Sequence, residues 1–95
     1  MNECCNKKKI RTEEEKKSLN IRLNKIIGQM NGIKKMIDED RYCDDILIQL
    51  AAIEKSVKSL STVILDNHMR TCLVKSIQNG DLTVVDEIVD LFKRF

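Results

Sequence analysis

The sequence lacks most of the residues that build sheets, tight turns and aromatic binding platforms. It has no proline or tryptophan, three glycines, and three aromatic residues among 95. With 42% apolar and 34% charged residues, this composition favours helices over sheets. No apolar run approaches the roughly 20 residues that span a bilayer, and the polar N-terminus lacks the apolar stretch of a secretory signal. We therefore expect a cytoplasmic, all-α protein with no membrane partner.

The basic residues are concentrated in the first third of the chain. From Lys7 to Lys35 there are ten Lys and Arg residues against three Glu. Such a stretch indicates a polyanion partner, although a solvated helix face explains a charge run equally well. We expect residues 1–11 to be a flexible basic tail and residues 12–95 to form one domain. Cys4 and Cys5 lie in this tail, and we assign them no specific role.

Two long stripes of apolar residues predict two long helices. Thr12 with Glu15 resembles a capping box, and the stripe after it predicts a helix over about 13–38, broken at residues 38–40. A second stripe predicts a helix over about 41–78. In both stripes the spacing alternates between three and four residues, except that the second stripe ends on two steps of four, and such spacing is typical of a helix packed along another helix. The first stripe is Leu19, Leu23, Ile26, Met30, Ile33 and Ile37, and the second is Cys43, Ile46, Leu50, Ile53, Val57, Leu60, Ile64 and His68.

A short third helix completes the predicted architecture. We expect Gly80 to end the second helix, and Thr83, with Asp86 three residues later, can open a last helix. The second helix is too long to bury its apolar face on one short partner. The fold class is therefore all-α, with two long helices and one short helix per chain, assembled by antiparallel helix pairing between chains.

Cys43, His68 and Cys72 are the candidate metal ligands. His68 and Cys72 are four residues apart, so a helix projects both from one face, but by itself this spacing is a weak signal. Cys43 lies 25 residues before His68, or about 37 Å along a straight helix. If two copies of the helix cross antiparallel near residues 55–58, Cys43 of one chain meets His68 and Cys72 of the other. Leu50, Ile53, Val57 and Leu60 would supply the apolar centre of that crossing.

Two thiolates and one imidazole favour a soft metal ion. Cu(I) accepts three-coordinate, sulfur-rich sites, whereas Zn(II) usually takes a fourth ligand. We therefore expect Cu(I). Four cysteines in a cytoplasmic protein are also more consistent with metal or redox chemistry than with structural disulfides.

These residues together resemble the CsoR/RcnR family of bacterial repressors. The resemblance covers residues 19–75 and needs no gap. It rests on the segments Arg22 to Gln29, Gly32-Ile33, Met36-Ile37 and Tyr42 to Leu47, and on Gln49, Ala52, His68 and Cys72.

The resemblance implies a three-helix repressor that forms dimers and dimer-of-dimers tetramers. Members bind operator DNA without a helix-turn-helix and release it when they bind their inducer. The Cys-His-Cys set resembles the copper(I)-sensing branch, since nickel and cobalt sensors use more histidines. The resemblance also implies that Tyr42 and Glu87 support the metal site from its second layer. The DNA-contacting residues that it implies are Arg22, Lys25, Lys55 and Lys58.

Other functions remain open at this point. Within the family, a sensor of persulfide or other thiol-reactive compounds could bridge Cys43 and Cys72 covalently. A cytosolic copper carrier would also use thiols, but it would leave the basic helix without a role. An enzyme is not expected, because no acid lies at a clear spacing to orient His68.

Overall fold

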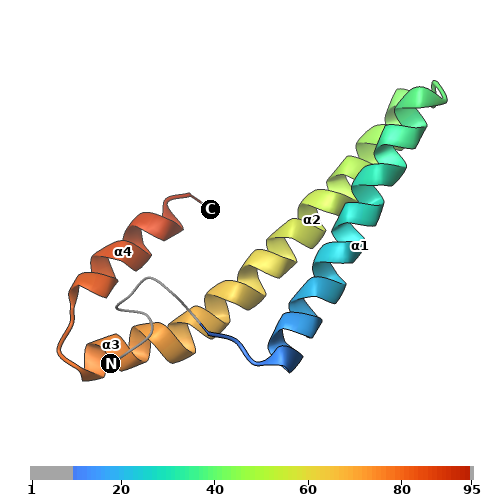
Figure 1. Ribbon diagram of the computed structural model, residues 1–95. Coiled ribbons are helices and arrows are strands. Elements are labelled where there is room, and N and C mark those ends of the chain that lie inside the picture. Colours follow the sequence, from blue (N-terminus) through green and yellow to red (C-terminus); the bar gives the residue numbers. More distant parts are fainter. Residues whose placement is uncertain (1–9, 95) are drawn as a thin grey trace. The chain divides into compact units, whose positions relative to one another are not determined.

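The computed structural model describes residues 10–94 and is helical throughout its ordered elements (Figure 1). Cys4, Cys5 and most of the predicted basic tail lie outside the described residues. The elements are α1 (Glu13–Asp38), α2 (Cys43–His68), the π-helical segment η2 (Met69–Leu73), α3 (Val74–Gln78) and α4 (Thr83–Phe92). No strand occurs between residues 10 and 94. Because α2, η2 and α3 follow one another without a break, the all-α prediction of two long helices and one short helix is confirmed.

Helix α1 begins at the predicted cap. The backbone N–H of Glu15 donates to Thr12 Oγ1 at 3.1 Å, while Thr12 itself keeps an extended backbone. This bond satisfies one of the amide groups that a helix leaves without a partner in its first turn. Three glutamates occupy that turn, where negative charge interacts favourably with the helix dipole. The sequence signal therefore locates the start of α1 correctly.

The end of α1 is formed by a left-handed residue. Asp40 has a φ of 54°, and its N–H donates to the carbonyl of Ile37 at 3.1 Å. The N–H of Arg41 donates to the carbonyl of Met36 at 2.9 Å. These two bonds form a Schellman motif, which satisfies carbonyls in the last turn of the helix. The polar break predicted at residues 38–40 is thus a tight helix terminus.

Gly80 closes α3 in the same way, with a φ of 81°, as the sequence predicts. The start of α4 differs from the prediction, because Thr83 is the first helical residue rather than the cap. Asp81 Oδ1 accepts the Thr83 N–H at 3.1 Å and the Thr83 hydroxyl at 2.6 Å. A charged carboxylate is the stronger acceptor, so Asp81 takes the role that was predicted for Thr83.

Residues 11–63 form a compact unit in which α1 and α2 lie side by side as a hairpin (Figure 1). Its core is made of Ile26, Ile33 and Ile53, with Ile46 and Leu60 packed against them. Within each helix these residues recur every seven positions. Each predicted stripe therefore contributes every second member to the core of its own chain.

The alternate members of the stripes are exposed. On α1 they are Leu23, Met30 and Ile37, and on α2 they are Cys43, Leu50 and Val57. We call the three α2 residues the outer line. The prediction that Ile53 lies at a crossing between chains is wrong, because Ile53 is buried in the core of its own hairpin; Leu60 is half-buried and packs against the same core. Helix α2 has two rows of apolar residues, one packed against α1 and one exposed in a single chain. The spacing of the residues does not tell which row packs against α1.

Residues 64–94 belong to the second compact unit. Its buried residues are Cys72, Ser76, Val84 and Ile88. The helix predicted over 41–78 begins at residue 43 and changes to π-helical hydrogen bonding over Met69–Leu73, which the sequence did not predict. Between residues 10 and 94, the structure contains no helix that is both long enough and apolar enough to cross a membrane.

Candidate functional site

The three predicted metal ligands lie at the ends of α2 and in η2. Cys43 is the first residue of α2 and is exposed, whereas His68 is the last residue and is half-buried. Cys72 lies in η2 and is only 4% exposed. Among residues 10–94 of one chain, no group of three or more His, Cys, Asp or Glu side chains is close enough to hold a metal ion. The Cys72 sulfur is in a disulfide in this structure, whereas Cys43 is a free thiol. The described residues of one chain therefore do not gather the three donors, and for Cys72 the expectation of metal or redox chemistry in place of a disulfide is not met.

The change from α-helical to π-helical hydrogen bonding at Met69 lies between His68 and Cys72. In a π turn the backbone N–H bonds to the carbonyl five residues earlier, so the turn holds about one residue more than an α-turn. The direction of Cys72 relative to His68 is therefore set by η2 and not by α-helical spacing. The prediction assumed a regular α-helix here, and the structure corrects this local geometry.

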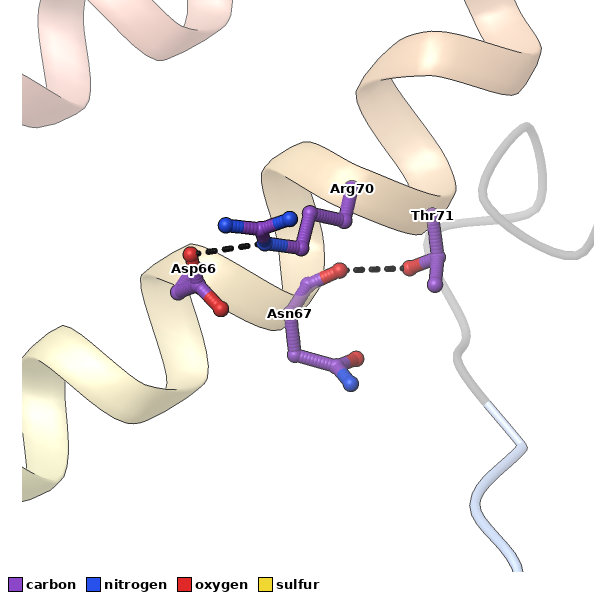
Figure 2. A network of polar contacts seen from close by, with 4 residues as sticks. All are labelled: Asp66, Asn67, Arg70 and Thr71. Atoms are coloured by element: carbon purple, nitrogen blue, oxygen red, sulfur yellow. Dashed lines mark hydrogen bonds and ion pairs between the residues drawn. The ribbon is translucent and has the colours of Figure 1, made fainter.

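Figure 2 draws two side-chain contacts that follow the helix through this region, and a third joins Thr71 to Cys72. The Thr71 hydroxyl donates to the backbone carbonyl of Asn67 at 2.7 Å, and Thr71 Oγ1 also lies 3.8 Å from Cys72 Sγ. Arg70 Nε donates to Asp66 Oδ1 at 2.9 Å. Sequence reasoning missed Thr71, although a threonine among predicted ligands on a helix could have been noted, since its hydroxyl can reach the preceding turn.

The two predicted supporting residues have different settings. Tyr42 directly precedes Cys43, and its side chain is exposed. Its backbone carbonyl accepts the N–H groups of Asp45 and Ile46 at 3.1 and 3.3 Å, so the residue helps to open α2. Glu87 lies on the exposed side of α4. Their predicted link to the metal site remains a prediction.

The predicted DNA-contacting residues all lie on the hairpin and are all exposed. Arg22 and Lys25 belong to α1, and Lys55 and Lys58 belong to α2. Arg22 Nη1 donates to Ser59 Oγ in a long hydrogen bond of 3.5 Å, and Ser59 follows Lys58 directly. The structure therefore brings Arg22 of α1 next to Ser59, the residue after Lys58 on α2. Sequence reasoning missed Ser59, because a single serine carries no signal for a contact 37 residues away.

Comparison with known proteins identifies relatives of this chain. A family model described as metal-sensitive transcriptional repressor matches residues 15–94. The copper-sensing transcriptional repressor CsoR of Bacillus subtilis (strain 168) is 36% identical over 86 residues, which cover 90% of this chain and 85% of the relative.

Two solved structures are similar to this chain. One is the copper-sensing repressor CsoR with Cu(I) from Geobacillus thermodenitrificans NG80-2, with a TM-score of 0.88 and 35% identity over 92% of both chains. The other is the nickel-responsive transcriptional regulator InrS, with a TM-score of 0.73 and 30% identity. The alignment with InrS covers 90% of this chain and 98% of that one.

Proposed function

This chain belongs to the family of metal-sensitive transcriptional repressors, and we propose that it represses transcription by binding operator DNA and releases that DNA when it binds Cu(I). The single observation that carries the proposal is the likeness, over 92% of the chain, to a copper-sensing repressor whose structure contains Cu(I). A regulator of this family is not an enzyme. Since its partner is operator DNA, we place its action in the cytoplasm.

The donor set of this chain fits Cu(I). Two cysteine sulfurs and one histidine nitrogen are soft or borderline ligands, and Cu(I) accepts such a set with three-fold coordination. A nickel sensor such as InrS is also similar in fold, but this chain has only one histidine. We assign Cu(I) binding to Cys43, His68 and Cys72 in the reduced chain, because the Cys72 sulfur can bind a metal only after its disulfide is reduced. A bound ion would link these ligands, which are not close together within one folded chain.

We place this site between two chains. Cys43 and His68 are the first and last residues of α2, so they cannot share an ion within one chain. The outer line begins at Cys43 and continues through Leu50 and Val57, which are 41% and 45% exposed. An antiparallel partner packed on this line would bring its own His68 and Cys72 to Cys43. A two-fold dimer would then hold two equivalent sites, and two dimers would form the proposed tetramer.

We propose that the hairpin contacts the DNA backbone. Arg22, Lys25, Lys55 and Lys58 are exposed, and the Arg22–Ser59 contact joins the basic residues of the two helices. Lys and Arg at such a surface bind phosphates and release counterions, which makes binding strongly dependent on salt. The sequence of the operator would be read in part through groove shape.

The proposed coupling is negative. Joining Cys43 of one chain to His68 and Cys72 of its partner changes how two α2 helices meet, and the basic surfaces lie on these same helices. In this proposal Tyr42, beside Cys43, and Glu87, on α4, pass the change on to the rest of the chain. By linkage, operator DNA must weaken Cu(I) binding by the same factor by which Cu(I) weakens DNA binding.

An anaerobic titration tests this function. The apoprotein selects a duplex from a random DNA pool, and fluorescence anisotropy then follows the labelled duplex as Cu(I) is added. We expect release at one Cu(I) per chain, and X-ray absorption should report two sulfurs and one nitrogen around the ion. Binding of Cu(I) without any loss of DNA affinity would contradict the proposal.

Variants locate the site. Cys43→Ala should bind the duplex like the unchanged chain but keep it after Cu(I) addition. A chain with Cys4→Ala and Cys5→Ala is the matched control and should respond normally. If polysulfide releases the DNA with a covalent mass increase while Cu(I) does not, the chain senses persulfides instead of copper.

A further inference from the structure

The two cysteines of the proposed copper site are in different oxidation states. The sulfur of Cys72 is in a disulfide, whereas Cys43 is a free thiol. Their surroundings also differ, because Cys72 is only 4% exposed and Cys43 is exposed. Neither copper binding nor operator binding accounts for the disulfide, since a metal site needs both sulfurs reduced.

The sequence restricts the partner of Cys72. The chain has four cysteines, and Cys43 is free, which leaves Cys4 and Cys5. Both lie outside the described residues, so pairing with one of them is part of the proposal. The bond therefore differs from the bridge between Cys43 and Cys72 that a persulfide sensor would form. Cys4 and Cys5 have no role in the proposed copper site.

We propose that this disulfide is a redox switch on copper sensing, in which Cys4 or Cys5 withholds the Cys72 sulfur from the metal. The inference rests on the proposed copper site and adds a condition under which that site works. A metal is bound by the thiolate of a cysteine, and a disulfide contains no thiolate. When Cys72 is oxidised, Cys43 is the remaining sulfur donor. The oxidised chain should therefore keep its operator even when Cu(I) is present.

Exchange with a low-molecular-weight thiol reverses the switch. One thiolate attacks a sulfur of the bond, forms a mixed disulfide and releases the other cysteine as a thiolate. A second thiolate attacks the mixed disulfide, which frees the second cysteine and leaves a low-molecular-weight disulfide. Two electrons pass from the two small thiols to the protein, and the two protons that these thiols lose end on the two cysteines. The low-molecular-weight disulfide drives the reverse reaction, so the ratio of the couple sets the state of Cys72.

Copper and reduction should favour the same state of the chain. Cu(I) binds the reduced form more tightly than the oxidised form, so by linkage it must shift the equilibrium toward the thiols. More of the small disulfide should then be needed to oxidise half of the chains when Cu(I) is present. Trapping of free thiols followed by mass spectrometry measures this shift without any DNA.

The main test compares the unchanged chain after treatment with glutathione and with glutathione disulfide, each removed before assay. The oxidised chain should be lighter by two hydrogen atoms, and peptide mapping should join Cys72 to Cys4 or Cys5. Anaerobic competition with a chromogenic chelator measures Cu(I) affinity. We expect oxidation to lower it by more than about 100-fold, because changing even a residue outside the ligand set costs about 10- to 100-fold.

Fluorescence anisotropy of the labelled operator duplex gives the second readout. Cu(I) should release the duplex from the reduced chain and not from the oxidised chain. Operator affinity without Cu(I) should be equal in both states, because the proposed DNA-contacting residues lie on the hairpin and Cys72 lies in the other unit.

Cysteine variants identify the partner. A chain with Cys4→Ala and Cys5→Ala should keep the Cys72 thiol in the glutathione ratio that oxidises the unchanged chain, and Cu(I) should still release its operator. The two single variants show which sulfur is used. Cys43→Ala is the matched control: it removes a thiol that is free in the structure, so it should still lose two hydrogen atoms on oxidation although it cannot sense copper.

Three results would overturn the inference. The first is an oxidised chain that binds Cu(I) and releases DNA like the reduced chain. The second is a Cys72 that joins Cys43, or that is oxidised equally when Cys4 and Cys5 are absent. The third is loss of the operator on oxidation alone, which would make the disulfide an inducer. The main comparison uses one unchanged chain, so it does not depend on whether a variant folds. If the reduced chain does not release DNA on Cu(I) addition, the proposed function has failed, and the chelator assay still decides this inference.

Discussion

The hairpin of residues 11–63 and the segment of residues 64–94 use helices in different ways. In the hairpin, both helices keep regular α-helical hydrogen bonding, and core isoleucines recur every seven residues. In the second segment, the helix changes directly after His68 to a π turn of five residues, Met69–Leu73, which contains Cys72. Regular repetition suffices for a scaffold that carries basic side chains. The segment that carries the two proposed ligands His68 and Cys72 departs from this regularity, and π turns are often found at functional sites.

Substitution in the outer line tests whether the hairpin is the surface by which chains assemble. Of the variants considered, we expect it to cause the largest loss of assembly and of operator binding. In Val57→Asp a carboxylate would have to be buried between two chains, at a cost of several kcal/mol. We expect the chain to become monomeric in light scattering, to keep its helical circular dichroism and to lose operator binding. Val57→Leu keeps the surface apolar and should remain assembled. An assembled Val57→Asp chain would contradict the proposed crossing.

The core of the hairpin should be the next most sensitive place. Ile53 is 5% exposed and packs with Ile26 and Ile33. Ile53→Ala leaves a cavity, so the free energy of unfolding should fall by about 2–5 kcal/mol, whereas Ile53→Val should lower it by about 0.5–1.5 kcal/mol. Urea denaturation at one fixed protein concentration measures both. Equal effects for the two variants would mean that Ile53 is not part of a tight core.

The cap of α1 should make a smaller contribution. Thr12→Ala removes the acceptor of the Glu15 N–H, and the loss of such a cap lowers the free energy of unfolding by about 1 kcal/mol. Thr12→Ser retains the acceptor and should unfold at nearly the same urea concentration as the unchanged chain. Because this cap is far along α1 from Cys43 in sequence, Cu(I) affinity should not change. A changed Cu(I) affinity would show that the scaffold and the sensor are not separable.

The ion pair in the second segment should matter least. Arg70 and Asp66 are 2.9 Å apart, but their side chains are 78% and 59% exposed. Exposed pairs four residues apart on a helix contribute about 0.3–0.5 kcal/mol and are screened by salt. Asp66→Asn should therefore shift the urea midpoint slightly at low salt and not at high salt. A large loss of Cu(I) affinity in Asp66→Asn would mean that this pair supports η2.

Much of the fold could be predicted because its signals are local. The Thr12 cap, the polar break before Arg41 and the stop at Gly80 each depend on a few neighbouring residues, and all three are confirmed. The family was also predicted correctly from the spacing of its residues. Glycine at residue 80 has a positive φ that other residues rarely adopt, which made this stop readable from the sequence. The sequence did not predict that Asp81, rather than Thr83, provides the side-chain acceptor at the start of α4. Two possible acceptors lie there within two residues of each other, and the sequence does not choose between them.

By itself the sequence determined where the helices run and which family the chain belongs to, and it predicted Cys43, His68 and Cys72 as metal donors. Only the tertiary structure decided how the apolar stripes divide, with Ile53 in the core of its own chain and Val57 left exposed. It also decided that η2 is a π turn and that Arg22 reaches Ser59. The physical reason is that the periodicity of a sequence shows which residues are apolar. It does not show which other helix, in the same chain or another, each of these residues packs against. Likewise, the choice between two hydrogen-bond patterns depends on contacts made after the chain has folded.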